Sequence, residues 1–346
     1  MKICFDGRVF AHSHLTGVER FARELLENLQ GVVPVYVEKP PSDRRLIHHV
    51  WEHVILPIKC KRFEMFIAPA NVGPIVFPEK CKYILVVHDV AFLNFPSAYS
   101  KTFRWYYNKV IPLAMKRTDV VITVSESESR NIVKSYPFVK DKIVVIYPGS
   151  NSKFHSAQPL PLEQREPYFL YVGSLNPRKN LWGLLKAFAI FKEKTSANVK
   201  LKVVGASYSI FNKVNVDSEI EVSDVDYLGY VTEDGLHKLY EKALAFVFPS
   251  FYEGFGYPPL EAMSYGTPAV VSNQSSLPEV TKGKAVYVDP RNPEDIADKM
   301  VQLVEDKDYW RKVSKEAKEV TKFYTWERTV NEFIKIMESI TGQRLQ

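Results

Sequence analysis

The chain has 346 residues, of which 46% are hydrophobic and 25% charged, and its formal net charge is +6. This length exceeds one ordinary hydrophobic core and fits two domains of roughly 150 residues each. The composition excludes the disordered, collagen-like and disulfide-rich classes, and no apolar run reaches the roughly 18 residues that a transmembrane helix needs.

The first residues and the three cysteines indicate the cellular compartment. Met1 leads directly into a strand-like segment rather than into the apolar region of a signal peptide, so we expect a cytoplasmic protein. Cys4, Cys60 and Cys81 are odd in number and lack the spacing of metal ligands, which favours buried thiols over disulfides or a zinc site.

In the first half, apolar runs of strand length alternate with amphipathic helical stretches, as is typical of parallel βαβ units. We predict strands over Ile3–Phe5, Val32–Val37, Met65–Ala68, Ile84–His88, Val120–Val124 and Ile143–Tyr147. We predict helices over Val18–Gln30, Tyr99–Arg117 and Glu126–Tyr136, and leave Arg44–Pro57 unassigned. The segment 148–167 is rich in proline and serine, which indicates a linker.

The same alternation restarts after this linker. We predict strands over Tyr168–Val172, Lys200–Val204, Tyr227–Tyr230, Ala245–Pro249, Ala269–Ser272 and Ala285–Val288. We predict helices over Leu181–Lys194, Glu233–Ala243, Tyr257–Tyr265 and Pro293–Glu305, and a helical stretch from Asp306 to Thr341 that breaks near Phe323–Trp326. The sequence therefore predicts an α/β protein of two doubly wound, Rossmann-like domains, 1–155 and 156–324, around a deep cleft. A C-terminal helix at about 325–346 is expected to return to the first domain.

Charge is distributed unevenly between the two halves. Residues 1–155 carry a net charge of +8 and residues 156–346 a net charge of −2. Basic and aromatic side chains alternate in Lys101–Lys109 and Arg44–His53. This pattern favours an anionic partner, such as a membrane surface, a polyanion or a phosphorylated substrate, and chance placement of solvated lysines is the alternative. Peripheral association with the inner face of the cell membrane therefore stays open.

The segment 249–272 carries the strongest functional pattern. Glu253 lies in a loop after a predicted strand, and Glu261 follows eight positions later inside a helix whose start is fixed by the prolines after Tyr257. Gly254 and Gly256 leave the loop backbone bare, so that its amides can approach an anion at the helix N-terminus. This arrangement suits a diphosphate flanked by sugar hydroxyls.

Three other polar segments follow predicted strands. Arg178 and Lys179 precede a helix, where a planar guanidinium and a compact ammonium can bind adjacent phosphates. His88 ends a strand of the first domain, and Gly17 opens the first predicted helix.

With these segments in this order, the chain resembles the retaining glycosyltransferases of the GT-B fold, group 1 (family 4). Among them it resembles the bacterial mannosyltransferases of polysaccharide assembly. The matching sequence segments are TGVER at 16–20, VVHDVAF at 86–92, VSE at 124–126, YPG at 147–149, YVGSLNPRKN at 171–180, LGYV at 228–231 and EGFGYPPLEAMS at 253–264. Many family members carry two glycines where this chain has only Gly17, so the chain departs from the family pattern in that loop.

The resemblance implies an acceptor-side first domain and a second domain that binds a nucleotide sugar. It implies that Arg178 and Lys179 bind the donor diphosphate, that His88 and Glu253 contact the donor sugar, and that Glu261 binds the ribose diol. The expected catalytic set is Arg178, Lys179, His88 and Glu253. The expected donor-binding set is Glu261, Gly17, Ser174, Gly254, Phe255, Gly256, Tyr230 and Val231, with the nucleotide base near Gly229–Val231.

The expected reaction moves a sugar, with GDP-mannose as the first choice of donor, to a hydroxyl of a glycan or lipid-linked acceptor with retention. Asp224 and Asp226 spell the D-x-D with which transferases of another fold hold a divalent cation. They lie in an acidic surface run before Tyr227–Tyr230, so we expect no metal there. We also expect no other cofactor and no nucleic acid partner. A phosphorylase, a sugar-nucleotide epimerase or a non-catalytic partner subunit remains as an alternative.

Overall fold

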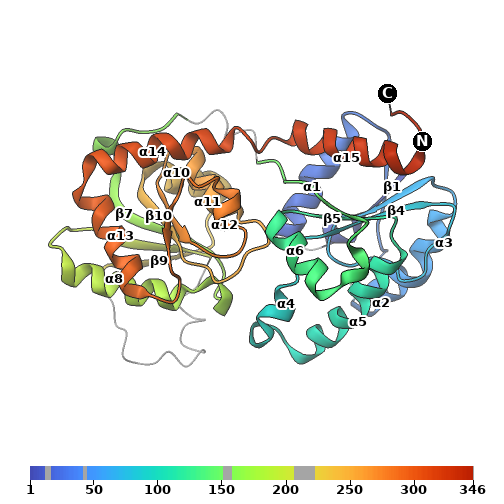
Figure 1. Cartoon of the computed structure of the whole chain (residues 1–346), viewed down its shortest axis with the longest axis horizontal. Coiled ribbons are helices and arrows are strands. Elements are labelled where there is room, and N and C mark those ends of the chain that lie inside the picture. The colour runs from blue at the N-terminus through green and yellow to red at the C-terminus, as the bar shows by residue number, and fades with distance from the viewer. Residues whose placement is uncertain (12–16, 42–44, 151–157, 206–222, 346) are drawn as a thin grey trace. The chain divides into compact units, whose positions relative to one another are not determined.

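The computed structural model describes all residues except 12–16, 42–44, 151–157, 206–222 and 346. The chain divides into two compact units (Figure 1). The first comprises Met1–Gly149 and Tyr324–Gln346, and the second comprises Ser150–Phe323. The boundary predicted after residue 155 falls in the segment 151–157, which lies outside the described residues. None of the described helices is long and apolar enough to cross a bilayer.

A parallel sheet of six strands forms the centre of the first unit, in the order β2-β1-β3-β4-β5-β6. The strands are β1 (Ile3–Asp6), β2 (Val35–Glu38), β3 (Met65–Ala68), β4 (Lys82–Val87), β5 (Val120–Thr123) and β6 (Ile143–Val145). The helices are α1 (Gly17–Gln30), α2 (Arg45–Val50), α3 (Leu56–Cys60), α4 (Ala91–Asn94), α5 (Lys101–Arg117), α6 (Glu126–Ser135) and α15 (Trp326–Thr341). Short turns are η1 (Gly7–Ala11), η2 (Trp51–Ile55), η3 (Pro96–Ala98) and η4 (Pro137–Val139).

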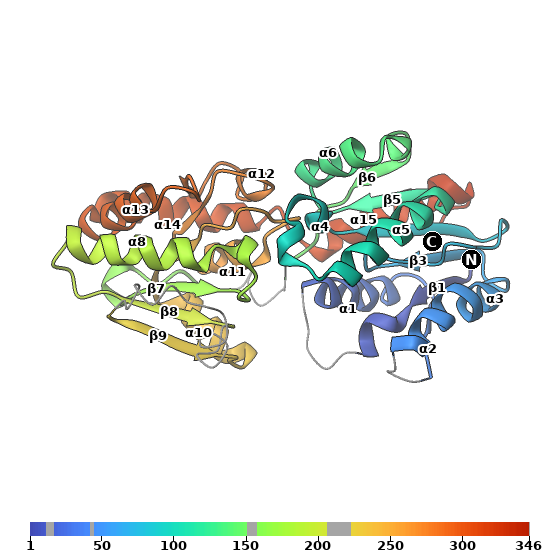
Figure 2. The same cartoon turned by 90° about the horizontal axis from the view of Figure 1, so that it is seen from below.

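Helices cover both faces of this sheet, because successive strand residues point to opposite sides. Ile84 and Val86 of β4 pack with α1 and α15, whereas Leu85 and Val87 pack with α3, α5 and α6. Figure 1 shows the sheet between these two helical layers, and Figure 2 shows the same sheet from its face, with β1, β3, β5 and β6 in that order. The three cysteines are buried free thiols, as predicted.

The second unit has its own parallel sheet, in the order β12-β11-β10-β7-β8-β9. Its strands are β7 (Glu166–Val172), β8 (Lys200–Val204), β9 (Val225–Gly229), β10 (Ala243–Phe248), β11 (Ala269–Ser272) and β12 (Val286–Val288). Its helices and turns are η5 (Leu162–Gln164), η6 (Pro177–Lys179), α8 (Leu181–Lys194), α10 (Glu233–Lys242), α11 (Tyr257–Ser264), α12 (Leu277–Val280), α13 (Pro293–Glu305) and α14 (Lys307–Thr321). The two sheets confirm the predicted α/β class with two Rossmann-like units.

Two segments of the first unit differ from the prediction. The strand predicted from Val32 begins only at Val35, because the amides of Val32 and Val33 donate to the Leu29 carbonyl at 2.9 Å and close the end of α1. The unassigned segment forms consecutive helical turns, α2, η2 and α3, of which η2 is a π-helix. A π-turn shifts side chains around the helix axis and obscures the 3.6-residue period.

The C-terminal helix returns to the first unit, as predicted. The Thr325 side chain accepts a hydrogen bond from the Arg328 amide and caps the start of α15. Four apolar side chains then repeat at intervals of three and four residues and enter the core beside α1: Trp326, Val330, Phe333 and Met337. The Trp326 Nε1 also donates to Glu24 of α1 at 2.6 Å. Figure 1 shows α15 beside α1.

We predict that α15 is required for the stability of the first unit. Phe333 is 0% exposed, and Phe333→Ala should lower the free energy of unfolding by about 3–5 kcal/mol, because it leaves a cavity in the core. Denaturant unfolding followed by circular dichroism measures this change. Lys335→Ala, at an exposed position of the same helix, is the matched control, and equal stability of both variants would contradict the prediction.

Candidate functional site

The carboxyl ends of β7, β10 and β12 are held together in the second unit by one side chain. Asn180 has a left-handed backbone conformation and caps α8 by accepting a hydrogen bond from the Gly183 amide. Its Nδ2 donates to the carbonyls of Pro249 at 3.0 Å and Pro290 at 2.7 Å. The loops that follow three strands are therefore fixed around a single buried amide.

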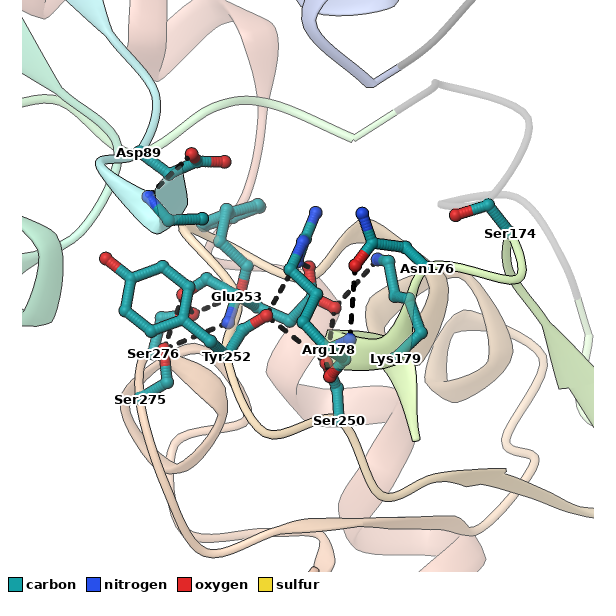
Figure 3. Close-up of polar contacts among 12 residues, drawn as sticks. Asp89, Ser174, Asn176, Arg178, Lys179, Ser250, Tyr252, Glu253, Ser275 and Ser276 are labelled. Carbon is teal, nitrogen blue, oxygen red and sulfur yellow. Dashed lines mark hydrogen bonds and ion pairs between the residues drawn. The ribbon is translucent and has the colours of Figure 1, made fainter. Parts of the chain in front are cut away.

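Glu253 lies between the two cations predicted to act with it (Figure 3). Its Oε2 is 3.0 Å from Nη1 of Arg178, and its Oε1 is 2.7 Å from Nζ of Lys179. The Ser250 hydroxyl donates to the same Oε1 at 2.7 Å. Residues 75 positions apart in the sequence thus form one ion-paired cluster at the carboxyl edge of the sheet.

The charges in this cluster fix the state of the carboxylate. Burial raises the pKa of Glu253, but the adjacent charges of Lys179 and Arg178 outweigh burial and lower its pKa to about 2. Glu253 is therefore an anion at neutral pH. Because two cations share one anion, the cluster keeps one positive charge, and the side chains of Arg178 and Lys179 are 15% and 14% exposed. A partly exposed site with net positive charge can bind an anion.

Two serines that the sequence analysis missed hold the Glu253 backbone. The Ser275 and Ser276 hydroxyls donate to the Glu253 carbonyl at 2.6 and 2.9 Å, and the Glu253 amide donates to Ser275 Oγ at 3.0 Å. Both serines follow β11, and serines directly after a predicted strand were the available signal. These bonds position the carboxylate from a third loop (Figure 3).

The loop 254–256 leads from this cluster into α11. Gly254, Phe255 and Gly256 are all buried, so the loop backbone is less open than the sequence analysis expected. Gly256 has a φ of 107°, which side-chain-bearing residues rarely adopt, and two prolines follow in the first helical turn. The first turn of α11 carries no acidic residue, so no carboxylate within that turn neutralises the partial positive charge of this helix end.

Glu261 lies within α11, as predicted, and is 4% exposed. Its Oε2 accepts a hydrogen bond from the Tyr240 hydroxyl of α10 at 2.8 Å. The other predicted donor-binding residues of this unit follow strands. Ser174 is exposed after β7, and Tyr230, 83% exposed, and Val231 follow β9.

The two aspartates of the D-x-D pattern are paired with lysines at the β9 edge of the sheet. Asp224 lies 2.8 Å from Lys192 Nζ, and Asp226 lies 3.3 Å from Lys200 Nζ. The strand begins at Val225, two residues earlier than predicted. Each carboxylate therefore already has a cation from the chain itself.

In the first unit, His88 is buried at the end of β4. Its Nε2 lies 2.7 Å from the Pro69 carbonyl, which can only accept, so Nε2 carries the proton and Nδ1 keeps the lone pair. Burial lowers the pKa of His88, against the opposing effects of this hydrogen bond and of Asp89. Asp89 accepts from the Ala91 amide and so caps the following turn. Gly17 is the exposed first residue of α1, and the rest of its predicted loop, 12–16, lies outside the described residues.

The first unit also contains a groove of about 930 Å³ that the sequence analysis missed. Aromatic side chains of 99–107 form part of its lining, together with Arg8, Glu52 and Asn71. Arg8 donates to both carboxylate oxygens of Asp6 and also pairs with Glu52. Asp6 ends β1 and Arg8 follows it two residues later. Polar residues directly after a predicted strand are the sequence signal that identifies this pair.

Comparisons with known proteins identify the family of the chain. A family model described as glycosyl transferases group 1 matches residues 152–320, and a model of Glycosyltransferase Family 4 matches residues 66–154. The O-antigen chain mannosyltransferase B of Escherichia coli is 32% identical over 243 residues, which are 67% of this chain and 63% of that protein. The O-antigen chain mannosyltransferase RfbU of Salmonella typhimurium is 32% identical over 207 residues, which are 60% and 56% of the two chains. The chain thus aligns with less than two thirds of the length of either relative.

The solved structure of HepE of Anabaena in complex with UDP and glucose superposes on this chain with a TM-score of 0.72. The superposition covers 99% of this chain and 100% of the HepE chain. Its sequence is only 16% identical, so this likeness bears on the fold alone. Together the two family models span residues 66–320 in continuous order. The chain belongs to the group 1, family 4 glycosyltransferases and has the GT-B fold.

Proposed function

We propose that the chain transfers a sugar, with mannose as the first candidate, from a nucleotide diphosphate donor to a hydroxyl of a glycan or lipid-linked acceptor, with retention of configuration. The observation that carries the proposal is the Arg178–Lys179–Glu253 cluster beside the N-terminus of α11. The relatives support the choice of mannose, because two of them are O-antigen mannosyltransferases at 32% identity. Retention rests on the family resemblance.

The cations act on the leaving group. Breaking the anomeric C–O bond places negative charge on the departing diphosphate, and fixed positive groups lower the barrier when they lie where that charge develops. Arg178 and Lys179 are held in place by Glu253, and Arg178 also donates to the Tyr252 carbonyl at 2.6 Å. They are therefore oriented before the donor binds. No metal is required in this proposal, because the chain supplies the neutralising charge.

Glu253 acts as a hydrogen-bond acceptor rather than as an acid or a base. A carboxylate with a pKa of about 2 neither donates a proton at neutral pH nor accepts one readily. Its oxygens can bind sugar hydroxyls, while a phosphate oxygen of the donor removes the acceptor proton. Neutral His88 contacts the sugar through Nδ1, because its Nε2 is held by Pro69, and Glu261 binds the ribose diol.

The groove of the first unit is the proposed acceptor site. Sugars bind flat aromatic faces together with polar groups, and the lining of the groove includes both Trp105, which is 66% exposed, and Asn71. This proposal refines the expectation of an acceptor-side first domain.

An apolar stripe on the first unit is the proposed membrane contact. Val50, Val54 and Ile58 repeat every four residues on the outer side of the helical segment α2–η2–α3, at 52%, 53% and 60% exposure. The expected aromatic face of α5 is mostly occupied, since Phe103, Tyr106 and Tyr107 pack partly against the core. Apolar side chains near basic ones can dock on an anionic lipid surface without spanning it.

The first prediction from this proposed function concerns the cations that bind the diphosphate. With GDP-mannose as donor, Arg178→Ala and Lys179→Ala should each lower kcat/KM by about 10²–10³-fold, because each removes a charge that stabilises the leaving group. Steady-state kinetics and thermal stabilisation across GDP-, UDP- and ADP-sugars measure the effect. Lys186→Ala, at an exposed position of α8, should match the wild type. Near wild-type rates in both site variants would contradict the proposal.

The second prediction concerns divalent cations. Transfer should persist in EDTA, and Asp224→Ala with Asp226→Ala should change kcat/KM less than about twofold, because both aspartates are paired with surface lysines. The measurement is the rate with and without Mg²⁺ or Mn²⁺. A strict requirement for either ion that this double variant abolishes would instead support the D-x-D interpretation.

The third prediction concerns the apolar stripe. Val54→Glu with Ile58→Glu should abolish co-sedimentation with anionic liposomes, because it removes apolar contact and adds repulsion. Binding of the wild type should weaken at high salt, since screening shortens the reach of surface charge to about 8 Å or less. Phe138→Glu is the control, because Phe138 is 43% exposed next to β6, at the opposite edge of the sheet from β2. Equal recovery with neutral and anionic vesicles, or no pelleting, would favour a soluble acceptor.

A further inference from the structure

Four side chains of the first unit converge where the helical segment α2–η2–α3 faces α5. His49, Glu52 and His53 lie on one side of that segment, and each offers a metal-ligating atom within 4.8 Å of the others. Glu52 and His53 fall within the π-turn η2, and π-turns are frequent at functional sites. The sequence pattern predicts no metal ligand in this segment.

A hydroxyl from the neighbouring helix lies at the centre of this group. Tyr106 Oη is 3.0 Å from His49 Nδ1, 3.2 Å from His53 Nε2 and 3.4 Å from a carboxylate oxygen of Glu52. Two imidazoles, one carboxylate and one phenol thus approach a common point from two helices.

The hydrogen bonds of the buried carboxylate are incomplete. Glu52 is 1% exposed, and Arg8 pairs with its Oε2. Among the described residues, neither Glu52 Oε1 nor the buried Nδ1 of His53 has a hydrogen-bond partner. A buried carboxylate oxygen without a donor is unfavourable. The atoms that face Tyr106 are Glu52 Oε2 and His53 Nε2, which lie 3.6 Å apart. The buried carboxylate thus keeps one oxygen without a donor beside a cluster of ligating atoms, which is compatible with a bound cation.

The donor set selects the ligand. Mg²⁺ and Ca²⁺ prefer all-oxygen sites, whereas two imidazoles with one carboxylate suit Zn²⁺ and similar transition metals. We propose that His49, Glu52 and His53 bind one Zn²⁺-like cation in the first unit, with Tyr106 or a groove ligand in the fourth position. His49 and Glu52 both line the groove. The site is independent of the donor-binding cluster, and the proposal concerns metal binding rather than a metal requirement for transfer.

Arg8 is compatible with a cation at this place. It holds only one oxygen of Glu52 and is itself bound by both oxygens of Asp6. The trio of Asp6, Arg8 and Glu52 therefore carries one net negative charge. Hydrogen bonding of a ligating carboxylate by a second residue is a common feature of metal sites, because it orients the carboxylate.

The test is a titration of the full chain, stripped of metal by a chelator, with ZnCl₂ and with Co²⁺. We expect calorimetry to show that about one equivalent of Zn²⁺ binds. We expect bound Co²⁺ to show the visible absorption of a four-coordinate site. His49→Ala and His53→Ala should each weaken binding by about 10-fold or more, and the double variant should abolish it. His49 is exposed, so its variant should keep the circular dichroism of the wild type.

His48→Ala is the matched control, because His48 lies on the same helix and the same groove but outside the three-residue cluster. It should bind Zn²⁺ within about twofold of the wild type. The proposal is overturned by a wild type that binds no more metal than the double variant, or by an equal loss of affinity in His48→Ala. Transfer activity is not the readout, so failure here is distinct from failure of the proposed glycosyl transfer.

Discussion

The second unit's site depends on one buried carboxylate, that of Glu253. A charge taken out of water needs both opposite charges and hydrogen bonds, and removal of one partner of a buried pair is strongly destabilising. Here the partners come from the loop after β7, while serines of the loop after β11 hold the same residue by its backbone. Three loops that are distant in sequence therefore have a shared position, and the cations reach a defined geometry without a ligand. Preorganisation of this kind is what electrostatic stabilisation of a leaving group requires.

Local patterns predict this fold well where one rule decides. The strand Lys200–Val204 and the helix Pro293–Glu305 have the predicted bounds, because lysines that alternate with apolar residues mark the strand and a proline at the first position marks the helix. Prediction fails where a distant or irregular bond intervenes. The amides of Val32 and Val33 close the end of α1 instead of starting a strand, and the π-turn in 51–55 breaks the helical period.

The candidate site also has features that the sequence predicts and features that it does not. Motif spacing in the sequence predicts that Arg178, Lys179 and Glu253 follow strands, since carboxyl ends of parallel strands share one edge. It cannot predict that Glu253 is already ion-paired with both cations, because 75 residues separate Arg178 from Glu253. That pairing changes the chemistry, since the lowered pKa makes Glu253 a much weaker base than an ordinary carboxylate. The Asp6–Arg8–Glu52 network likewise arises only when β1 and η2 come together.

The return of the chain through α15 makes the second unit an insertion into the first. On the ribosome, residues 150–323 emerge as a complete unit while the first unit still lacks Trp326, Val330 and Phe333. The nascent first unit must therefore wait with an uncovered apolar surface beside α1, and domains that wait in this way are prone to aggregation. Completion of the first unit requires synthesis of α15, so a chain truncated at residue 323 has a complete second unit and a first unit that lacks part of its core.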